Sequence, residues 1–301
     1  SMKLLAMAWR ALWRDARAGE LRLLWVAVSL GVAALTSVGF LADRIQGGLQ
    51  RDARQLLGGD AVLASDHEPA PAVLAQIKQL GLQSAVTLSF PTMARSSPAQ
   101  GGNSRLVALK AVAPGYPMRG RLQILPPLDQ AVPKPALATE LNNGTPYDRP
   151  GVVTQDIPQA GQVWAEPALL EALEVKVGDD ILLGERTLRI SEVLMSEPDR
   201  GAGFMNFAPR IMMNQADLAA TELIQPASRL NCRLAVVGTP AQLSAFTQWA
   251  ESYVKQPDVH GVRLETLEAG RPEMRQTLDR AEKFLHLVAL LAALLSAVAV
   301  A

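Results

Sequence analysis

The sequence has only one cysteine among its 301 residues, and its three histidines (His67, His260 and His286) are far apart. The single thiol, Cys232, excludes an internal disulfide and a cysteine-rich metal site. An excess of positive charge is also missing, since lysine and arginine together number 29 and so do aspartate and glutamate. These absences argue against a disulfide-stabilised domain, a metal centre and a nucleic-acid-binding protein.

Catalytic motifs are missing as well. The chain has no GxxxxGK(S/T) phosphate-binding loop, no GxSxG nucleophile elbow and no HExxH zinc motif. Its acidic pair, Asp179 and Asp180, follows Gly178, and aspartate is common in such turns for backbone reasons. We therefore expect no catalytic residue and no metal ligand in this chain, and no ATP-binding site of its own.

Proline is absent from both ends of the chain, because all 20 prolines fall between Pro69 and Pro272. Two long apolar runs occupy these proline-free ends, at residues 23–42 and 284–301, and neither run carries a formal charge. About 20 apolar residues are needed to span the hydrocarbon core of a bilayer. We predict transmembrane helices over residues 21–42 and 284–301, the second of which is cut short where the sequence stops.

A cleaved signal peptide is the alternative interpretation of the first apolar run. Such a peptide has a shorter apolar stretch and a cleavage site of small residues. This run is longer, and it continues directly into DRIQGGLQRDARQLL, whose apolar residues recur at helical spacing. We therefore favour a membrane anchor that is retained in the mature protein.

The charges beside the first run predict its orientation. Residues 2–22 carry five basic and two acidic side chains, whereas the charges that follow the run nearly cancel. Cytoplasmic flanks of membrane helices are enriched in lysine and arginine. We therefore predict that the N-terminus lies in the cytoplasm and that residues 43–283 lie on the far side of the membrane.

The residues before the first span, 2–19, are predicted to form an amphipathic helix in the membrane interface. On a helical wheel the two indoles share one face and the arginines line another, which suits indoles at headgroup depth and arginines facing anionic lipid. A basic flank without fixed structure is the alternative. The residues assigned to this interface are Trp9, Arg10, Trp13, Arg14 and Arg17.

Helical patterns also appear inside and just beyond the two spans. Ser29, Ala33 and Ser37 recur every four residues, which gives the first span a small-residue face where another helix could pack closely. Residues 43–58 and 271–283 continue the helical pattern past each apolar run. We predict that these two extensions form a helical stalk that carries the intervening domain.

The segment between the stalk helices is predicted to be a two-lobed α+β domain. Residues 59–120 read as a strand (DAVLAS), a helix (APAVLAQIKQLG) and further strands (SAVTLSF and SRLVALKAV), and residues 226–269 read as strand, helix and strand. Two such strand–helix–strand units can join into one ferredoxin-like βαβ sheet with its helices on one face. Residues 121–225 are rich in proline and glycine and have short alternating strands. We predict that they form a mostly-β lobe inserted into the α+β lobe.

The loop EPDRGAGFMNFAPR, residues 197–210, combines two glycines with adaptable apolar side chains. Phe204, Met205 and Phe207 would suit contact with a hydrophobic substrate or a protein partner. The alternative is that these side chains belong to the core of the β lobe, and the sequence alone favours that alternative slightly.

The assembled features resemble a known family, the FtsX-like ABC transporter permeases of the MacB and LolC/LolE group. The stretch LLEALEVKVGDDILLGERTLRISEVL, in which Lys176–Asp179 precede a strand pair, is similar to a recurrent segment of their periplasmic domains. The stretches LADRIQGGLQRDARQLLGGDAVLAS, AVAPGYPMRGRLQ and APRIMMNQADLAAT resemble bacterial permeases of this kind. The resemblance runs over most of the chain.

This resemblance implies a non-catalytic, multi-pass subunit of the bacterial inner membrane with a periplasmic domain. ATP and magnesium would be bound by a separate cytoplasmic ABC ATPase, whose cycle would move the periplasmic domain by mechanotransmission. The resemblance further suggests a hydrophobic or lipid-like substrate, contact with membrane lipids and a periplasmic thioesterase or lysophospholipase as a partner. A two-span membrane receptor or sensor is the main alternative, and a membrane-tethered hydrolase is disfavoured by the missing nucleophile motifs.

Overall fold

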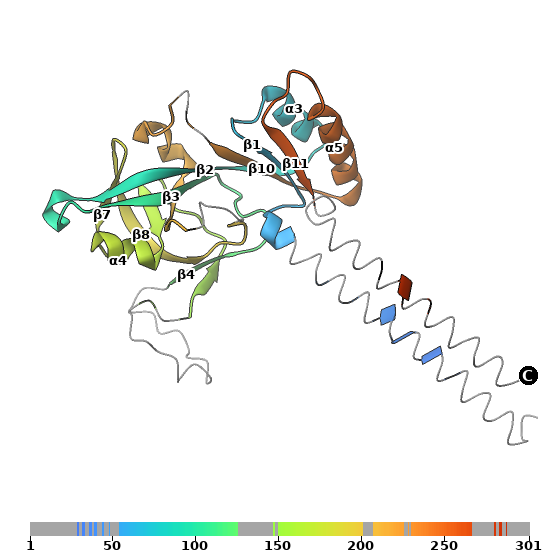
Figure 1. The fold of residues 1–301 in the computed structure, drawn as a ribbon, viewed down its shortest axis with the longest axis horizontal. Helices are drawn as coiled ribbons and strands as arrows, with labels where there is room; N and C mark the ends of the chain where they lie inside the picture. Colours follow the sequence, from blue (N-terminus) through green and yellow to red (C-terminus); the bar gives the residue numbers. More distant parts are fainter. Residues whose placement is uncertain are drawn as a thin grey trace, which may run out of the picture. The chain divides into compact units, whose positions relative to one another are not determined.

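The computed structural model describes residues 54–125, 147, 150–200, 207–225, 228 and 230–266, together with isolated helical positions nearer the two ends of the chain. By their contacts the residues form two compact units, residues 1–51 with 271–301 and residues 52–270. The second unit contains every strand that the structure describes (Figure 1).

The first unit is described only at scattered positions, all of them helical and most of them exposed. They include Ser29, Ala33 and Ser37, whose role in helix packing stays a prediction. Among the residues that the structure describes, no helix is both long enough and apolar enough to span a membrane. Most of the predicted spans, 21–42 and 284–301, lies outside the described residues. So do the predicted interface residues Trp9, Arg10, Trp13, Arg14 and Arg17.

One part of the second unit has the strand order of a ferredoxin-like fold. Two strand–helix–strand segments interleave, so that β11, β1, β10 and β2 are neighbours in that order and each adjacent pair is antiparallel. Both helices cover the same face of this sheet (Figure 1), which is the split βαβ arrangement. The elements of this ferredoxin-like part are β1 (Ala61–Ser65), α3 (Pro71–Gln79), the first half of β2 (Gln83–Ser96), β10 (Asn231–Val237), α5 (Pro240–Tyr253) and β11 (Val262–Thr266).

Local sequence signals explain where the two helices begin and which faces they bury. Helix α5 starts with a capping box, in which the side chain of Thr239 accepts from the backbone N–H of Gln242 and the Gln242 side chain accepts from that of Thr239. Phe246 of α5 is fully buried and packs in one cluster with Val73 and Ile77 of α3 and with the strands beneath. This shared apolar cluster fixes both helices on the sheet.

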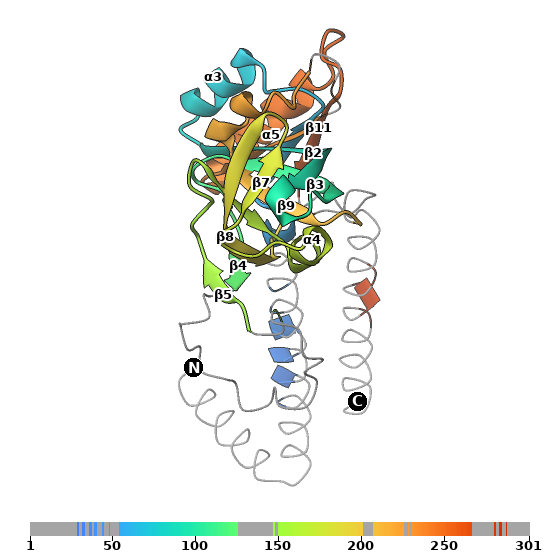
Figure 2. The same cartoon turned by 90° about the vertical axis from the view of Figure 1, so that its left-hand side faces the viewer.

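The remaining strands form a closed β-barrel. Strand β2 pairs with β3, β3 with β9, β9 with β6, β6 with β8, β8 with β7, and β7 returns to β2. In a closed ring each strand can form backbone hydrogen bonds to a neighbour on both sides, so no edge strand is left. Outside the ring, β4 pairs with β8 and β5 pairs with β4. The barrel elements after β2 are β3 (Ser104–Val112), β6 (Gln162–Ala165), β7 (Asp180–Leu183), β8 (Arg186–Ser196) and β9 (Arg210–Asn214), and those outside the ring are β4 (Leu122–Leu125), β5 (Val152–Thr154) and α4 (Pro167–Leu173). Figure 2 shows these strands from the side of the barrel.

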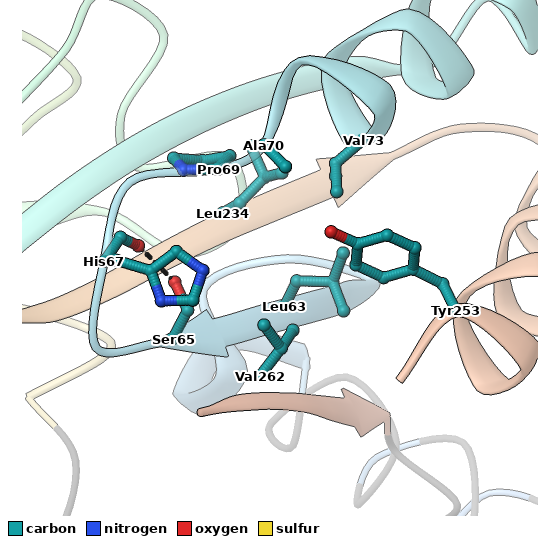
Figure 3. A pocket seen from close by; sticks show the side chains of 9 residues that line it. All are labelled: Leu63, Ser65, His67, Pro69, Ala70, Val73, Leu234, Tyr253 and Val262. Atoms are coloured by element: carbon teal, nitrogen blue, oxygen red, sulfur yellow. Dashed lines mark hydrogen bonds between the residues drawn. The ribbon is translucent and has the colours of Figure 1, made fainter. Parts of the chain in front are cut away.

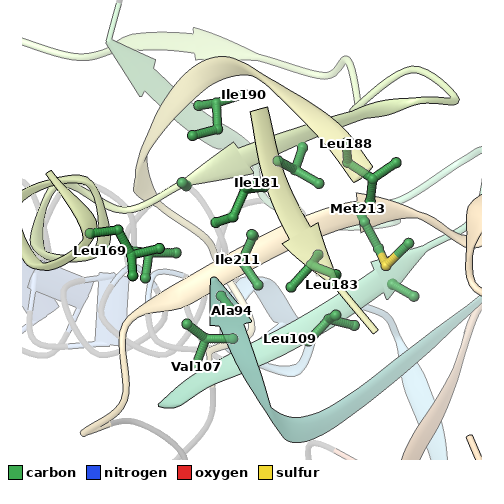
Figure 4. Packing of buried hydrophobic residues seen from close by; sticks show 14 of the residues in the cluster. Ala94, Val107, Leu109, Leu169, Ile181, Leu183, Leu188, Ile190, Ile211 and Met213 are labelled. Carbon is green, nitrogen blue, oxygen red and sulfur yellow. The ribbon is translucent and has the colours of Figure 1, made fainter. Parts of the chain in front are cut away.

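The barrel interior is packed with aliphatic side chains from alternate strand positions (Figure 4). Leu109 and Ile211, which are register partners on β3 and β9, are fully buried there. Ile181 of β7 and Leu169 of α4 belong to the same cluster. The barrel therefore encloses a solid hydrophobic core rather than a channel.

The Lys176–Asp179 motif forms the turn that leads into the β7–β8 hairpin. The Asp179 carboxylate accepts from the backbone N–H of Lys176 at 2.9 Å, and the N–H of Gly178 donates to the carbonyl of Ile190 at 2.8 Å. Gly178 has a φ of +96°, a conformation that glycine adopts without strain. The motif is thus explained by backbone geometry, which agrees with the turn expected at Asp179, whereas Asp180 is already the first residue of β7.

Strand β2 joins the two parts, because its 14 residues run from the ferredoxin-like sheet into the barrel. Strand β3, expected in the α+β lobe, pairs in parallel with β9 of the middle segment and lines the barrel core. The boundary predicted between residues 120 and 121 therefore falls within one continuous sheet, and the division into two lobes stays a prediction. The mixed α/β class is confirmed.

Candidate functional site

A cluster of charged side chains is buried outside the barrel wall, beside the loop at residues 197–210. Lys110 of β3 is 2% exposed, and its ammonium lies 2.9 Å from a carboxylate oxygen of Glu197 and 2.7 Å from one of Asp199. Arg210, at the start of β9, donates from Nε to the other oxygen of Glu197 at 2.5 Å. The Tyr116 hydroxyl also lies against this group, 2.5 Å from Asp199. We call these five side chains the buried network.

The alternation of strand β3 places Lys110 in this cluster. Its neighbours Leu109 and Ala111 point into the barrel core, so Lys110 points away from it. On that outer face a smaller apolar cluster, which includes Val112 and Trp164, surrounds the same region. An ammonium buried among such side chains needs charged partners, because desolvation without pairing is very costly.

The network is balanced in charge, with two cations facing two carboxylates. Burial alone raises the pKa of Asp199, but the charge and hydrogen bond of Lys110, together with Tyr116 and the more distant Arg233, hold that pKa below its ordinary value. Burial raises the pKa of Tyr116 well above its ordinary range, and the charges of Asp199 and Glu197 raise it further. Tyr116 is therefore a neutral hydrogen-bond donor to an ionised Asp199.

The lowered pKa of Asp199 predicts an acid-dependent loss of stability. Because the folded-state pKa lies below the unfolded value of about 3.9, the ionised group stabilises the fold fully above about pH 4 and progressively less as the pH falls through the folded-state pKa. We expect Asp199→Asn to be less stable than the original chain at pH 7, and the difference to shrink below pH 4. Urea denaturation of the full chain at a series of pH values measures this. Asp258→Asn, at an exposed position, is the control, and a pH-independent difference for Asp199→Asn would contradict the expectation.

A second polar group lies in residues 54–60, which precede β1 and are called the lead-in segment below. The Asp60 carboxylate, almost fully buried, accepts two hydrogen bonds from Arg119, from Nε at 3.0 Å and from Nη2 at 2.8 Å. Arg54 lies 3.9 Å from the same carboxylate. The bidentate geometry gives both strength and fixed orientation, so it ties residues 54–60 to the segment after β3.

Two glycines allow this lead-in segment to approach the buried network. A side chain added at Gly58 would come within 3.0 Å of the Asp199 side chain, and one at Gly120 would come within 2.5 Å of Pro198. Both glycines have positive φ, +78° and +82°. Residues 54–60, the segment after β3 and the beginning of the 197–210 loop thus meet in one place.

The predicted contact loop is fixed at both ends. Its first residues carry Glu197 and Asp199, its last residue is Arg210, and Arg200 forms an ion pair with Glu166 before α4. Phe207 is 86% exposed and therefore does not belong to the core of the barrel. The other two predicted contact residues, Phe204 and Met205, lie outside the described residues.

A small apolar pocket lies apart from the network, at the rim of the ferredoxin-like part (Figure 3). Its polar groups do not form a nucleophile–base pair, since the Ser65 hydroxyl donates to the backbone carbonyl of His67, and the His67 ring contacts Asp66 at 2.7 Å. The lone thiol, Cys232, is buried, and burial raises its pKa to about 11. Within the described part of the chain, no three histidine, cysteine or acidic residues gather as a metal site would require.

The sequence did not reveal the buried network. Its members are far apart in the chain, since Lys110 and Asp199 are separated by 89 residues, and no local pattern links them. The one available signal is Lys110 itself, a single charge in the otherwise apolar stretch LVALKAV. The loop that the sequence singled out does contain part of the network, but its contribution comes from the charged residues Glu197, Asp199 and Arg210 at its ends.

Comparison with known proteins gives one close relative in sequence. Over 292 residues the chain is 34% identical to the uncharacterized ABC transporter permease YbbP of Escherichia coli K12. The matched part is 97% of this chain and 32% of that protein, so the chain spans about a third of the length of its relative. No protein-family model matches the chain.

Three solved structures are similar over most of the chain at low identity. The periplasmic region of MacB from Actinobacillus actinomycetemcomitans has a TM-score of 0.40 and 11% identity, over 75% of this chain and 95% of that one. The extracellular domain of the ABC-type transporter YknZ from Gram-positive bacteria has a TM-score of 0.37 and 10% identity, over 68% and 100%. A domain of a permease protein from Porphyromonas gingivalis has a TM-score of 0.37 and 10% identity, over 69% and 89%.

Proposed function

The chain belongs to the family of the ABC transporter permease YbbP, and we propose on that basis that it acts as part of the membrane subunit of an ABC transporter. The observation that carries the proposal is the 34% identity over 97% of the chain. In this proposal a separate cytoplasmic ATPase subunit of the YbbA type binds ATP and magnesium, and the permease itself is not catalytic. In the same proposal the protein lies in the bacterial inner membrane, with its N-terminus in the cytoplasm and residues 43–283 on the periplasmic side.

The proposed mechanism is mechanotransmission. Movements driven by the ATPase would reach the periplasmic domain through the segments that lead into β1 and out of β11. The described contacts suit this role, because Asp60 and Arg119 tie the lead-in segment to the domain and Gly58 approaches Asp199 of the buried network. A segment held by a bidentate ion pair passes on displacement better than one attached by a loose linker.

The proposed contact surface is the loop at residues 197–210. The exposed side chain of Phe207 supports contact with a hydrophobic or lipid-like substrate, or with a periplasmic thioesterase or lysophospholipase. We include Phe204 and Met205 in this surface from their place in the sequence. Because the network fixes both ends of the loop, Phe207, three residues before Arg210, would move with the domain.

Copurification tests the proposed function. The full-length permease, expressed with its ATPase subunit and solubilised in detergent, is expected to retain that subunit and to change its ATPase rate. An unrelated inner-membrane protein with the same tag is the control. If the subunits do not associate and the ATPase rate is unaffected, the proposal is wrong, and a receptor or sensor becomes the better hypothesis.

The same preparation tests the contact loop. A Phe204→Ser/Phe207→Ser variant is expected to retain the ATPase subunit and to lose binding of the periplasmic esterase. Leu74→Ser on α3, where the leucine is 46% exposed, is the matched control for removing an exposed apolar side chain. Equal binding by all three proteins would show that the loop is not the contact surface.

A further inference from the structure

Arg233 of β10 contacts both segments through which the chain joins the second unit. Its Nη1 donates to the Glu265 carboxylate of β11 at 2.8 Å, and its Nη2 donates to the backbone carbonyl of Leu57 at 3.2 Å. Leu57 ends the short helical stretch that precedes β1, and Glu265 is the penultimate residue of β11. One guanidinium therefore spans the lead-in segment and the lead-out strand.

The register of the sheet explains how one side chain reaches both. Arg233 lies opposite Ala64 of the neighbouring β1, and Ala64 lies opposite Arg263 of β11. The next residue, Leu234, packs into the helix-covered cluster, so Arg233 points to the opposite face of the sheet. On that face its side chain is only 19% exposed, while that of Arg263 is 73% exposed.

Arg233 also acts on the buried network. Its positive charge is one of the influences that lower the pKa of Asp199. Gly58, the residue after Leu57, lies against the side chain of Asp199. The lead-in segment thus contacts Arg233 at Leu57 and lies against Asp199 of the network at Gly58.

We infer that Arg233 is a positioning residue that couples the lead-in segment, the lead-out strand β11 and the base of the 197–210 loop. A displacement of either segment changes the position of the guanidinium, and through Leu57 and Gly58 it changes the position of Asp199. Arginine is required because its planar fork makes both hydrogen bonds at once, whereas a lysine ammonium is a point charge. The use of this coupling in transport rests on the proposed function, but the coupling itself does not.

Hydrogen exchange of the full chain in detergent tests the inference. The reporters are the amides of Gly58, which donates to Arg54, and of Asp60, which donates to Val236. Loss of a hydrogen bond to a charged group is expected to speed exchange at these amides by about tenfold or more in Arg233→Gln. Arg233→Lys is expected to give an intermediate effect. Arg263→Gln is the matched control, because Arg263 also contacts Glu265, at 3.3 Å, but is mostly exposed.

The variant Glu265→Gln tests whether Arg233 couples the two segments or only stabilises the strand that it contacts. It provides this test even if Arg233→Gln does not fold. This change removes the carboxylate of the lead-out strand only. Coupling predicts faster exchange at Gly58 and Asp60, on the other segment, as well as in β11. If Glu265→Gln speeds exchange in β11 alone, or if Arg263→Gln acts like Arg233→Gln, the inference is overturned. Since no ATPase is present in this experiment, failure of the proposed function would leave its result unchanged.

Discussion

Replacing Lys110 with methionine is expected to destabilise the domain by about 3–5 kcal/mol, the usual cost of removing one partner from a buried ion pair. Methionine keeps most of the volume of the lysine stem, so the effect comes from the charges left behind. Asp199 would lose its closest cation, at 2.7 Å, and Glu197 would keep the hydrogen bond from Arg210. Two buried carboxylates would then face one cation.

Urea denaturation of the full chain measures this effect, with Lys78→Met as the control at an exposed position of α3. The control is expected to change the free energy of unfolding by less than about 0.5 kcal/mol. The double variant Lys110→Met/Asp199→Asn should be less destabilised than the sum of its single variants, because it removes a cation together with an anion. A cost below about 1 kcal/mol for Lys110→Met would show that the network does not hold charges as described.

Replacing Phe246 with alanine is expected to cost about 3–5 kcal/mol. This side chain of α5 is 0% exposed and lies in the cluster that joins both helices to the ferredoxin-like sheet. Alanine would leave a cavity between α3, α5 and the strands that carry Leu63 and Val236. The helix-covered strands include β1 and β11, so both segments that join the domain would be weakened.

Two further variants distinguish the loss of Phe246 packing from a general loss of helix stability. Phe246→Leu keeps most of the apolar volume and is expected to cost clearly less than the alanine change. Leu74→Ala on α3, where the side chain is 46% exposed, is expected to change the free energy of unfolding only slightly. Similar values for Phe246→Ala and Leu74→Ala in urea denaturation would contradict the assigned packing.

The elements of the ferredoxin-like part could be predicted from the sequence because their signals are local. The stretch around Thr239 combines an N-cap residue, a proline in the first turn and apolar residues at helical spacing, and α5 begins there. Strand β3 was predicted from SRLVALKAV with the bounds that the structure shows. Strand β2 was predicted too short, because Pro91 near its middle resembles a strand end.

The barrel and the buried network could not be predicted because they depend on contacts between distant residues. Closure requires β7 to pair with β2, which joins Ile181 to Ser96. No local pattern indicates such a pairing, since short alternating strands fit an open sheet equally well. The same holds for Lys110, whose partners come from a loop read for its aromatic residues.

The prediction of an ABC transporter permease agrees with the 34% identity to YbbP over 97% of the chain. That prediction depended on whole stretches of sequence rather than on chemistry. The structure adds a physical reason for one of them, since Asp179 and Gly178 build the turn before β7. The transmembrane helices, the interface helix and the stalk stay predictions.

Hydrogen exchange of the permease–ATPase complex in lipid nanodiscs, with and without a non-hydrolysable ATP analogue, tests the central claim most directly. That claim is that motion from the ATPase reaches the domain through the segment at Gly58 and Asp60. We predict that the analogue changes exchange at these two amides and at the end of β8, and that Arg233→Gln abolishes the change at β8. Identical exchange in both nucleotide states, from a complex that still hydrolyses ATP, would contradict the account.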